Sequence, residues 1–306
     1  FTSGATESTN LVFLGLLLAP RTRQRIVVSS IEHKAVLESA ALLEEHGFEV
    51  IRLPVTSDGV VDMEMAERAI TCDTALVSVQ AANNEIGTIQ PVSQLAHLAH
   101  QVGAFYHVDA VQALGKMPVS MLDWECDFAS FSAHKIYGPK GIGALFVRGG
   151  PQRWPWPHPL RGGGQEGGLR PGTLNVPGIV GFGAACSHMM QRPDSVLKNL
   201  ASLRDLLEKK LKEQLKENII VLGNSSLRLP NTLAFIIKDI SAELIVSTIK
   251  HSMLSTSSAC ISDLKSTSHV VSAIGYDENF GKNLLRISLL ESTNLNDIEK
   301  FISEYV

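Results

Sequence analysis

Apolar and polar residues alternate along the first half of the chain in short blocks that predict strands separated by amphipathic helices. Strands that alternate with helices in this way are typical of parallel β-α units. We therefore expect an α/β fold with a mostly parallel sheet flanked by helices. The predicted strands cover residues 25–30, 48–53, 75–79, 104–108 and 127–131, with one more ending at 147, and the predicted helices cover 7–18, 33–46, 62–70 and 91–102.

Beyond Val147 the pattern changes to Pro-, Trp- and Gly-rich segments, and a second set of elements follows. Residues 191–194 form the boundary, which predicts a large domain over 1–190 and a smaller α+β domain over 191–306. The second half predicts helices over 176–190, 195–215, 242–250, 266–274 and from 295, strands over 219–222, 232–237 and 284–289, and a polar run over 252–258.

Three glycines in the changed segment, Gly162, Gly164 and Gly167, have the spacing of a dinucleotide-binding motif. No strand leads into them and no helix follows at once, so we reject that reading. A flexible loop that crosses a dimer interface fits the segment better.

Composition narrows the class of protein. The chain has 306 residues, of which 44% are hydrophobic, and a net charge of -4, which gives no electrostatic case for direct nucleic-acid binding. The longest apolar run, residues 11–20, is about half of the roughly 20 residues that a membrane span needs, so we expect no membrane association. The chain opens at Phe1 within a motif and without a basic leader, so we expect no signal peptide and a further segment upstream.

The four cysteines contain no Cys-x-x-Cys pair, which argues against a zinc site or a dithiol redox site, and we expect no bound metal. Cys72, Cys126 and Cys186 lie beside or within apolar elements and are expected to be buried thiols. Cys260 differs because it follows the polar run. This usage is typical of a reducing, cytoplasmic compartment.

Polar side chains follow several predicted strands. His33, Asn84, Asp109 and Lys135 each come just after a strand-like run, and in open α/β sheets working residues gather at the strand ends. Each has an ordinary alternative, because His33 and Asp109 could cap helices and Asn84 could serve a turn. Thr6 could likewise cap the first helix, whose free N–H groups would suit an anion. Four such residues at four strand ends favour a shared site.

Lys135 lies between two strands, after Ser132 and His134 and before a Gly-Pro-Lys-Gly turn. A buried or half-buried amine shifts its pKa easily and becomes a nucleophile towards carbonyls, and a hydroxyl and an imidazole suit phosphate. A surface hairpin with a solvated lysine is the alternative.

Nine short motifs span nearly the whole chain. They are Thr2-Ser-Gly-Ala-Thr-Glu7, Glu32-His33, Ala82-Asn-Asn-Glu-Ile-Gly87, His107-Val-Asp-Ala-Val-Gln112, Ser130-Phe-Ser-Ala-His-Lys-Ile-Tyr-Gly-Pro-Lys-Gly141, Gly162-Gly-Gly-Gln-Glu166, Arg170-Pro-Gly-Thr173, Ser257-Ser-Ala-Cys260 and Arg286-Ile-Ser288. In this order the motifs resemble those of the cysteine desulfurases, pyridoxal-phosphate enzymes of the class V aminotransferase type with fold type I. The Ser-rich stretch before Cys260 is similar to that of the group with a long active-site cysteine loop.

The resemblance implies a role for each matched residue. Lys135 would hold the cofactor covalently, Asp109 would pair with the ring nitrogen, and His33 would stack on the ring and relay protons. Asn84 and Arg286 would bind the substrate carboxylate, Asn84 lying at the cofactor as well. The remaining cofactor contacts would come from Gln112 at the ring hydroxyl, from Ala5, Thr6, Ser132 and His134 at the phosphate, and from Thr173 at the phosphate of the partner subunit.

The implied reaction converts L-cysteine to L-alanine and leaves a persulfide on Cys260 for a sulfur-acceptor protein. Iron–sulfur cluster assembly, tRNA thiolation and DNA phosphorothioation are the pathways that the family serves, and a homodimer is expected. Two alternatives stay open: a selenocysteine lyase or another class V aminotransferase, and a catalytically silent subunit that positions a sulfur acceptor.

Overall fold

The computed structural model describes residues 1–248, 254–256 and 268–305. Contacts divide the chain into two units, each described here by itself. Unit 1 comprises residues 1–54, 61–82 and 90–191, and unit 2 comprises 55–60, 83–89 and 192–306. Two short segments of the first half, 55–60 and 83–89, therefore pack with the second half. The domain limits expected from the sequence stay a prediction.

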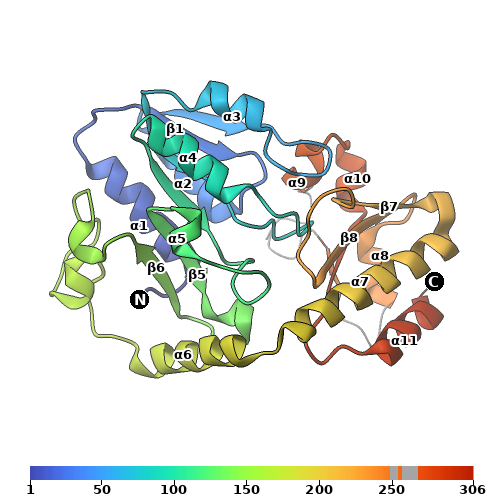
Figure 1. Cartoon of the computed structure of the whole chain (residues 1–306). Coiled ribbons are helices and arrows are strands. Elements are labelled where there is room, and N and C mark those ends of the chain that lie inside the picture. Colours follow the sequence, from blue (N-terminus) through green and yellow to red (C-terminus); the bar gives the residue numbers. More distant parts are fainter. Residues whose placement is uncertain (249–253, 257–267, 306) are drawn as a thin grey trace. The chain divides into compact units, whose positions relative to one another are not determined.

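Unit 1 is built on a six-stranded sheet with the strand order β2-β1-β3-β4-β5-β6 (Figure 1). Its strands are parallel except β6, which pairs antiparallel with β5. The predicted mostly parallel sheet is thus confirmed. The strands are β1 (Arg25–Ser29), β2 (Glu49–Leu53), β3 (Thr74–Ser78), β4 (Phe105–Asp109), β5 (Phe128–Ser132) and β6 (Gly143–Val147).

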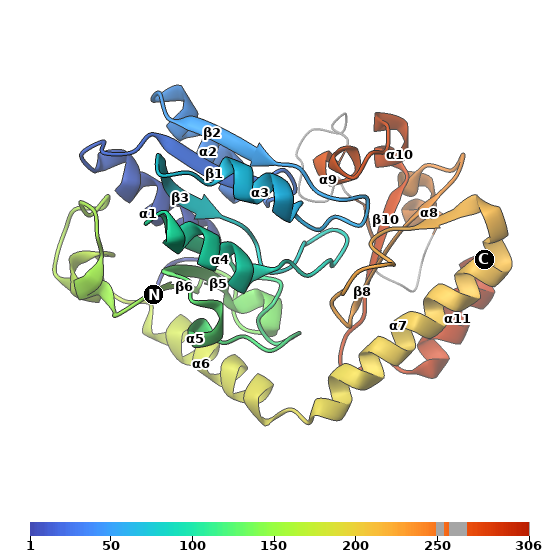
Figure 2. The same cartoon turned by 45° about the horizontal axis from the view of Figure 1, so that its top comes forward.

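Helices cover both faces of this sheet. α1 and α2 pack together, and α3 and α4 pack together on the opposite face, in front of the sheet in Figure 2. Apolar side chains of α1 meet those of the strands in a core that includes Phe13, Ile26, Val28, Leu76 and Phe128. The helices of unit 1 are α1 (Ala5–Leu18), α2 (Lys34–Glu45), α3 (Met63–Ala69), α4 (Val92–Gln101), α5 (Met121–Trp124) and α6 (Val176–Gln191), with 3-10 turns η1 (Ala133–Ile136), η2 (Pro151–Arg153) and η3 (Gln165–Gly168).

The segment before α1 crosses the start of β6 at a position that only glycine can fill. Thr2 and Gly143 exchange two backbone hydrogen bonds of 3.1 and 2.9 Å. A Cβ atom at Gly143 would lie 2.3 Å from the carbonyl oxygen of Phe131 and 2.6 Å from the Cα of Gly4. Gly143 therefore lets the start of α1 lie against the β5–β6 pair.

Unit 2 contains a four-stranded antiparallel sheet with the order β7-β8-β10-β9. α7 and α11 pack against each other, and leucines of α7 share a core with β8, β10 and α11. The elements are α7 (Asp194–Leu215), η4 (Lys216–Asn218), β7 (Ile219–Val221), β8 (Thr232–Ile237), α8 (Ala242–Thr248), β9 (Ser255–Thr256), α9 (His269–Ala273), α10 (Glu278–Lys282), β10 (Leu284–Ser288) and α11 (Leu295–Tyr305).

Several expectations need correction. Thr6 does not cap α1, because the helix begins at Ala5 and Gly4 takes the cap position without a side-chain bond. Cys72 is exposed in the turn after α3 and Cys186 is half-buried, so of the three expected buried thiols only Cys126 is buried. The polar run is not wholly a loop, because Ser255–Thr256 pairs with β10 as β9. No helix in the described part of the chain is long and apolar enough to cross a membrane.

Candidate active site

His33 lies in the turn between β1 and α2 and caps the helix. Its Nδ1 accepts a hydrogen bond of 3.1 Å from the Ala35 N–H, and the side chain is half-buried. Since Nδ1 is the acceptor, the neutral imidazole carries its proton on Nε2. The capping role that the sequence allowed therefore also fixes which ring nitrogen can donate a proton.

Asp109 ends β4 and is almost buried, with 7% of its surface exposed. Its Oδ1 accepts a hydrogen bond of 3.0 Å from the Val111 N–H. Burial raises the pKa of the Asp109 carboxyl, while that hydrogen bond and the electrostatic effects of His33 and Lys135 act in the opposite direction. His33 and Lys135 thus both lie within electrostatic reach of Asp109.

Lys135 and His134 lie on η1, directly after β5, and both side chains are exposed. The expected half-buried amine is therefore not seen. Burial lowers the pKa of His134, and the neighbouring charges of Lys135, Lys140 and Lys116 lower it further. Ser132, the last residue of β5, is buried and its Oγ accepts a hydrogen bond of 2.9 Å from the Ala5 N–H. This bond joins the start of α1 to the strand that carries the lysine.

We call His33, Asp109, Ser132 and Lys135 the strand-end cluster. All four follow or end β1, β4 or β5, so the parallel register places them at the same edge of the sheet. Gln112 follows Asp109, and its Oε1 accepts a hydrogen bond of 2.7 Å from Lys116, which leaves the Gln112 amide NH₂ as a donor. Thr6 and Thr173 are exposed, Thr6 in the first turn of α1 and Thr173 just before α6.

A buried histidine lies beneath the cluster and was missed in the sequence. His107 Nδ1 is 2.7 Å from Ser78 Oγ and its Nε2 is 2.8 Å from Ser130 Oγ. Thr9 of α1 donates to the same Ser130 oxygen at 3.4 Å. Burial lowers the pKa of His107 to about 3, so the imidazole is neutral. It joins β3, β4 and β5 two residues before Asp109.

A buried carboxyl supports the His33 turn from the other side. Glu32 Oε1 accepts hydrogen bonds of 2.5 Å from Ser29 Oγ and 2.9 Å from the Gln80 N–H. Burial and, to a smaller extent, the Asp109 charge raise the pKa of Glu32 from a usual value of 4.5 to about 8, against the lowering effect of the hydrogen bonds from Ser29 and Gln80. The signal in the sequence was the Glu32-His33 pair, of which only the histidine received a role.

Asn84 and Arg286, the predicted carboxylate ligands, both belong to unit 2. Arg286 of β10 donates from Nη1 to the Asn84 carbonyl oxygen at 2.7 Å, and its Nε is buried without a hydrogen-bond partner in the part of unit 2 that the structure describes. Asn83, and not Asn84, stabilises the turn, because its Oδ1 accepts hydrogen bonds from the Glu85 and Ile86 N–H groups. Cys260 lies outside the described residues.

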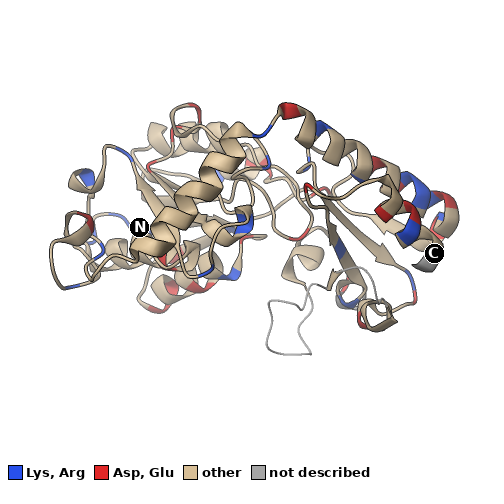
Figure 3. Cartoon of the chain, turned by 90° about the horizontal axis from the view of Figure 1, so that it is seen from below, with Lys and Arg blue, Asp and Glu red and all other residues tan. Residues whose placement is uncertain are grey.

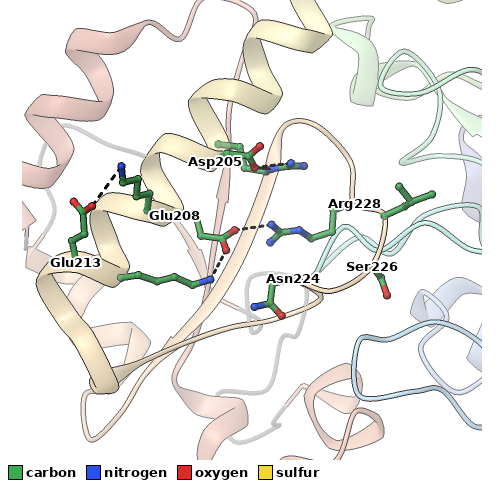
Figure 4. Close-up of a pocket in the computed structure, with 10 residues that line it drawn as sticks. Asp205, Glu208, Glu213, Asn224, Ser226 and Arg228 are labelled. Atoms are coloured by element: carbon green, nitrogen blue, oxygen red, sulfur yellow. Dashed lines mark hydrogen bonds and ion pairs between the residues drawn. The ribbon is translucent and has the colours of Figure 1, made fainter.

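An open groove of about 730 Å³ on unit 2 contains none of the predicted site residues. Figure 4 shows that its charged side chains are joined to one another by ion pairs. Glu208 binds Lys212 and Arg228 at 2.6 Å each, and charged residues of both signs follow the later part of α7 (Figure 3). We call this the α7 groove, and it is lined by Arg204, Asp205, Glu208, Lys209, Lys212, Glu213, Asn224, Ser226, Leu227 and Arg228.

The strand-end cluster offers a buried carboxylate, an imidazole donor and a primary amine, and the start of α1, bound to Ser132, adds N–H groups. The N–H groups of Thr6 and Glu7 have no helix carbonyl four residues before them and can bind an anion. This donor set fits a ring that carries a basic nitrogen, an aldehyde and a phosphate.

Comparisons with known proteins agree with that chemistry. Residues 1–301 match the family model described as aminotransferase class-V. The mitochondrial cysteine desulfurase of Arabidopsis thaliana is 39% identical over 303 residues, covering 99% of this chain and 66% of the relative. The cysteine desulfurase IscS of Dictyoglomus turgidum is 38% identical over 301 residues, covering 97% of this chain and 75% of the relative. The chain thus spans about two thirds to three quarters of these relatives.

Solved structures show the same fold. A NifS-like protein superposes with a TM-score of 0.86 at 36% identity, covering 99% of this chain and 80% of the other. DndA from Streptomyces lividans superposes with a TM-score of 0.80 at 36% identity, covering 94% and 81%. SspA, whose structure was solved in complex with cysteine, superposes with a TM-score of 0.80 at 32% identity, covering 94% and 80%.

Proposed function

The chain belongs to the cysteine desulfurases of the class-V aminotransferase family, and on that premise we propose that it removes the sulfur of L-cysteine, releases L-alanine and passes the sulfur to an acceptor protein. The observation that supports this proposal is that His33, Asp109 and Lys135 follow or end parallel strands at one edge of the unit 1 sheet, with His33 and Lys135 both acting electrostatically on Asp109. The complex of the similar SspA with cysteine supports L-cysteine as the substrate.

Cysteine desulfurases of this family depend on pyridoxal phosphate. When bound, the cofactor supplies an electron sink for the charge that develops on the substrate carbon. In this chain Lys135 would hold it, Asp109 would face its ring nitrogen, and His33 would lie on its ring. Gln112 would donate to the ring hydroxyl, and the contacts at the phosphate would come from Ala5, Thr6, Ser132 and His134, with Asn84 at the cofactor as well.

Proton transfer falls to the residues around the amine. Lys135 would take the proton from the substrate Cα and return it later, and His33, whose Nδ1 is an acceptor, would donate from Nε2–H. Arg286 would bind the substrate carboxylate together with Asn84, because its buried Nε still has a proton to donate.

Cys260 would carry the sulfur step. Its thiolate attacks the substrate sulfur, an S–S bond forms as the C–S bond of the substrate breaks, and the released carbon takes a proton to become the methyl group of alanine. The product on the protein is a Cys260 persulfide. A free thiol with a pKa near 8.5 is only a few per cent ionised at pH 7, so the proton must be handed to a base at the site.

The alternatives receive less support. The relatives reported above are named as cysteine desulfurases, which favours that activity over a selenocysteine lyase or another aminotransferase. A silent subunit would not need His33, Asp109 and Lys135 together at one edge of the sheet. Iron–sulfur cluster assembly, tRNA thiolation and DNA phosphorothioation are the candidate destinations of the sulfur. Cysteine usage favours the cytoplasm, although the Arabidopsis relative is named as mitochondrial.

A homodimer completes the proposal. α6 contains no Asp, Glu, Lys or Arg and is uncoloured along its length in Figure 3. Its exposed side includes Val176 at 58%, Val180 at 65% and Met190 at 87% exposure. A second copy would cover this apolar face and bring the preceding Thr173 to the cofactor phosphate of the partner.

The decisive experiment supplies L-cysteine to the protein loaded with pyridoxal phosphate and measures sulfide and alanine in the presence of a thiol. Equal amounts of both products are expected. The Cys260→Ser variant should release almost no sulfide, whereas the matched Cys72→Ser variant should work as the parent does. Mass spectrometry after brief exposure should place one extra sulfur on Cys260. Sulfur on another cysteine, or no alanine from the parent, would refute the proposal.

A further inference from the structure

A carboxylate lies in the first turn of α1, next to the N–H groups assigned to the cofactor phosphate. Glu7 accepts a hydrogen bond of 2.9 Å from the Ser3 N–H at its Oε2. Arg170, far away in the sequence, donates from Nε to Glu7 Oε1 at 2.7 Å and from Nη2 to Oε2 at 3.4 Å. The two side chains are only 21% and 28% exposed, so water screens the pair incompletely.

An acidic residue at a helix start is favourable on its own, because it complements the helix dipole. Beside a bound phosphate the same carboxylate is unfavourable, because two anions then share one helix end. Burial raises the pKa of Glu7, but the bonds from Arg170 and Ser3 outweigh it and hold the pKa below its usual value. Glu7 is therefore charged at neutral pH and needs a counter-charge.

We infer that Arg170 is a positioning residue that neutralises Glu7 and so allows the start of α1 to accept the phosphate of the cofactor. The inference rests on the proposed function, because that function assigns the phosphate to this helix start. The guanidinium is suited to the task, since it stays charged and grips both carboxylate oxygens. Glu166 is a second carboxylate that acts on Arg170 by charge, and Glu7 acts on it more strongly through the hydrogen bond.

An alternative interpretation is that the Glu7–Arg170 pair only holds the segment before Thr173 against α1. The two readings differ in what they predict for Glu7. If Arg170 compensates a charge, Glu7→Gln breaks the ion pair and yet leaves phosphate binding intact or stronger. If the pair only holds the two segments together, Glu7→Gln and Arg170→Gln weaken cofactor binding equally.

The test measures binding of pyridoxal phosphate and of pyridoxal, which lacks the phosphate, to the cofactor-free protein by titration calorimetry. Arg170→Gln should weaken the binding of pyridoxal phosphate on the order of tenfold and leave the binding of pyridoxal unchanged. The loss of affinity should be smaller at high salt. The double variant Arg170→Gln/Glu7→Gln should recover the parent affinity. Arg161→Gln, which removes the same charge from an exposed position of the same segment, is the control and should bind as the parent does.

Each outcome decides one question. Unchanged binding of pyridoxal phosphate by Arg170→Gln, or failure of Glu7→Gln to restore it, overturns the inference. If Arg170→Gln, Glu7→Gln and the double variant each lose the same affinity for pyridoxal as for pyridoxal phosphate, the pair only holds the two segments together, and the inference is overturned. Failure of the parent itself to bind pyridoxal phosphate would instead refute the proposed function, so the two failures are distinguishable.

Discussion

The strand-end cluster of unit 1 and the α7 groove of unit 2 are both rich in charged side chains, but these side chains differ in how they are paired and buried. In the groove each charged side chain has an oppositely charged neighbour, and the pairs form along one helix and the loop beside it. In unit 1, ionisable groups from separate elements lie beside one another, with Asp109 and Glu32 buried, His33 half-buried and Lys135 exposed, and burial raises the pKa of Asp109 and of Glu32.

The difference shows that an open hollow does not by itself locate chemistry. The charges that line the groove are matched in pairs, from the exposed Lys209–Glu213 to the largely buried Glu208–Arg228, so little of that charge is left to act on other groups. Catalytic groups need pKa values moved away from their ordinary range, and burial beside a like or opposite charge moves them. The predictions below test whether activity and stability follow this division.

The largest effect is expected at Lys135. Lys135→Ala should lower desulfurase turnover by at least about 10³-fold, because the amine both holds the cofactor and moves the proton. The visible absorbance of the bound cofactor should shift, and borohydride should no longer fix it to the protein. Lys140→Ala, in the neighbouring turn, is the matched control and should keep both properties. Fixation of the cofactor on Lys140 would show the cluster to be misassigned.

Asp109→Asn should follow, with a loss of turnover of roughly 10²–10³-fold and a much smaller loss of cofactor affinity. The amide keeps the shape of the carboxyl and its bond to the Val111 N–H, but it cannot stabilise a positive ring nitrogen. Steady-state kinetics together with cofactor titration separate the two quantities. Turnover at the parent rate would remove Asp109 from the mechanism.

In the α7 groove a substitution should change stability rather than turnover. Glu208→Gln should lower the free energy of unfolding by about 3 kcal/mol, because Arg228, only 6% exposed, loses its partner. Turnover per folded molecule should not change. Arg228 and Lys212 lower the pKa of Glu208 against the raising effect of burial, so its stabilisation is present above the unfolded pKa and fades as pH falls. Urea titrations of parent and variant measure this, and a loss of turnover would break the comparison.

Much of the fold could be predicted from the sequence because the apolar runs are short and regular. Strand β8 was expected over Thr232–Ile237 and lies there, and the limits of β1 and α6 differ by one residue from those predicted. The short helices α5 and α10 were missed because four or five residues show no helical period. Thr6 was wrongly expected to cap α1, because the choice among neighbouring small residues depends on Ser132, which binds the Ala5 N–H across the sheet.

The candidate site could be predicted only in part, for a similar reason. His33, Asp109 and Lys135 follow strand ends, which the sequence reveals. The groups beneath them bind partners distant in sequence: Glu32 binds the Gln80 N–H and His107 binds Ser130. Only the order of β1, β3, β4 and β5 brings these together, and strand order is not written in local patterns.

Glu32 offers a smaller, pH-dependent test within unit 1. Its folded pKa of about 8 exceeds the usual 4.5, so the folded state holds a proton that the unfolded state has lost. Stability from this group is fully present below pH 4.5 and is lost as pH rises towards 8, at up to about 1.4 kcal/mol per unit. Relative to Glu32→Gln, the parent should therefore lose stability between pH 6.5 and 8. His107 does not interfere, because its pKa of about 3 leaves it neutral there. Urea titrations of the parent and of Glu32→Gln at each pH measure this difference. If the free energy of unfolding of both proteins changed equally with pH, Glu32 would not be buried as a neutral acid.

The smallest effect is expected at the rim of the α7 groove. Lys209 and Glu213 are 3.8 Å apart and 73% and 61% exposed, so water and salt screen their attraction and ordering two long side chains offsets what remains. Lys209→Ala should change the free energy of unfolding by less than about 0.5 kcal/mol and leave turnover unchanged. Glu208, on the same helix, is itself largely buried and has two partners, one of which, Arg228, is also buried, so the gap between Lys209→Ala and Glu208→Gln measures what burial and the second partner add. Equal losses in both would mean that burial does not set the strength of these pairs, and the contrast between groove and cluster would lose its physical basis.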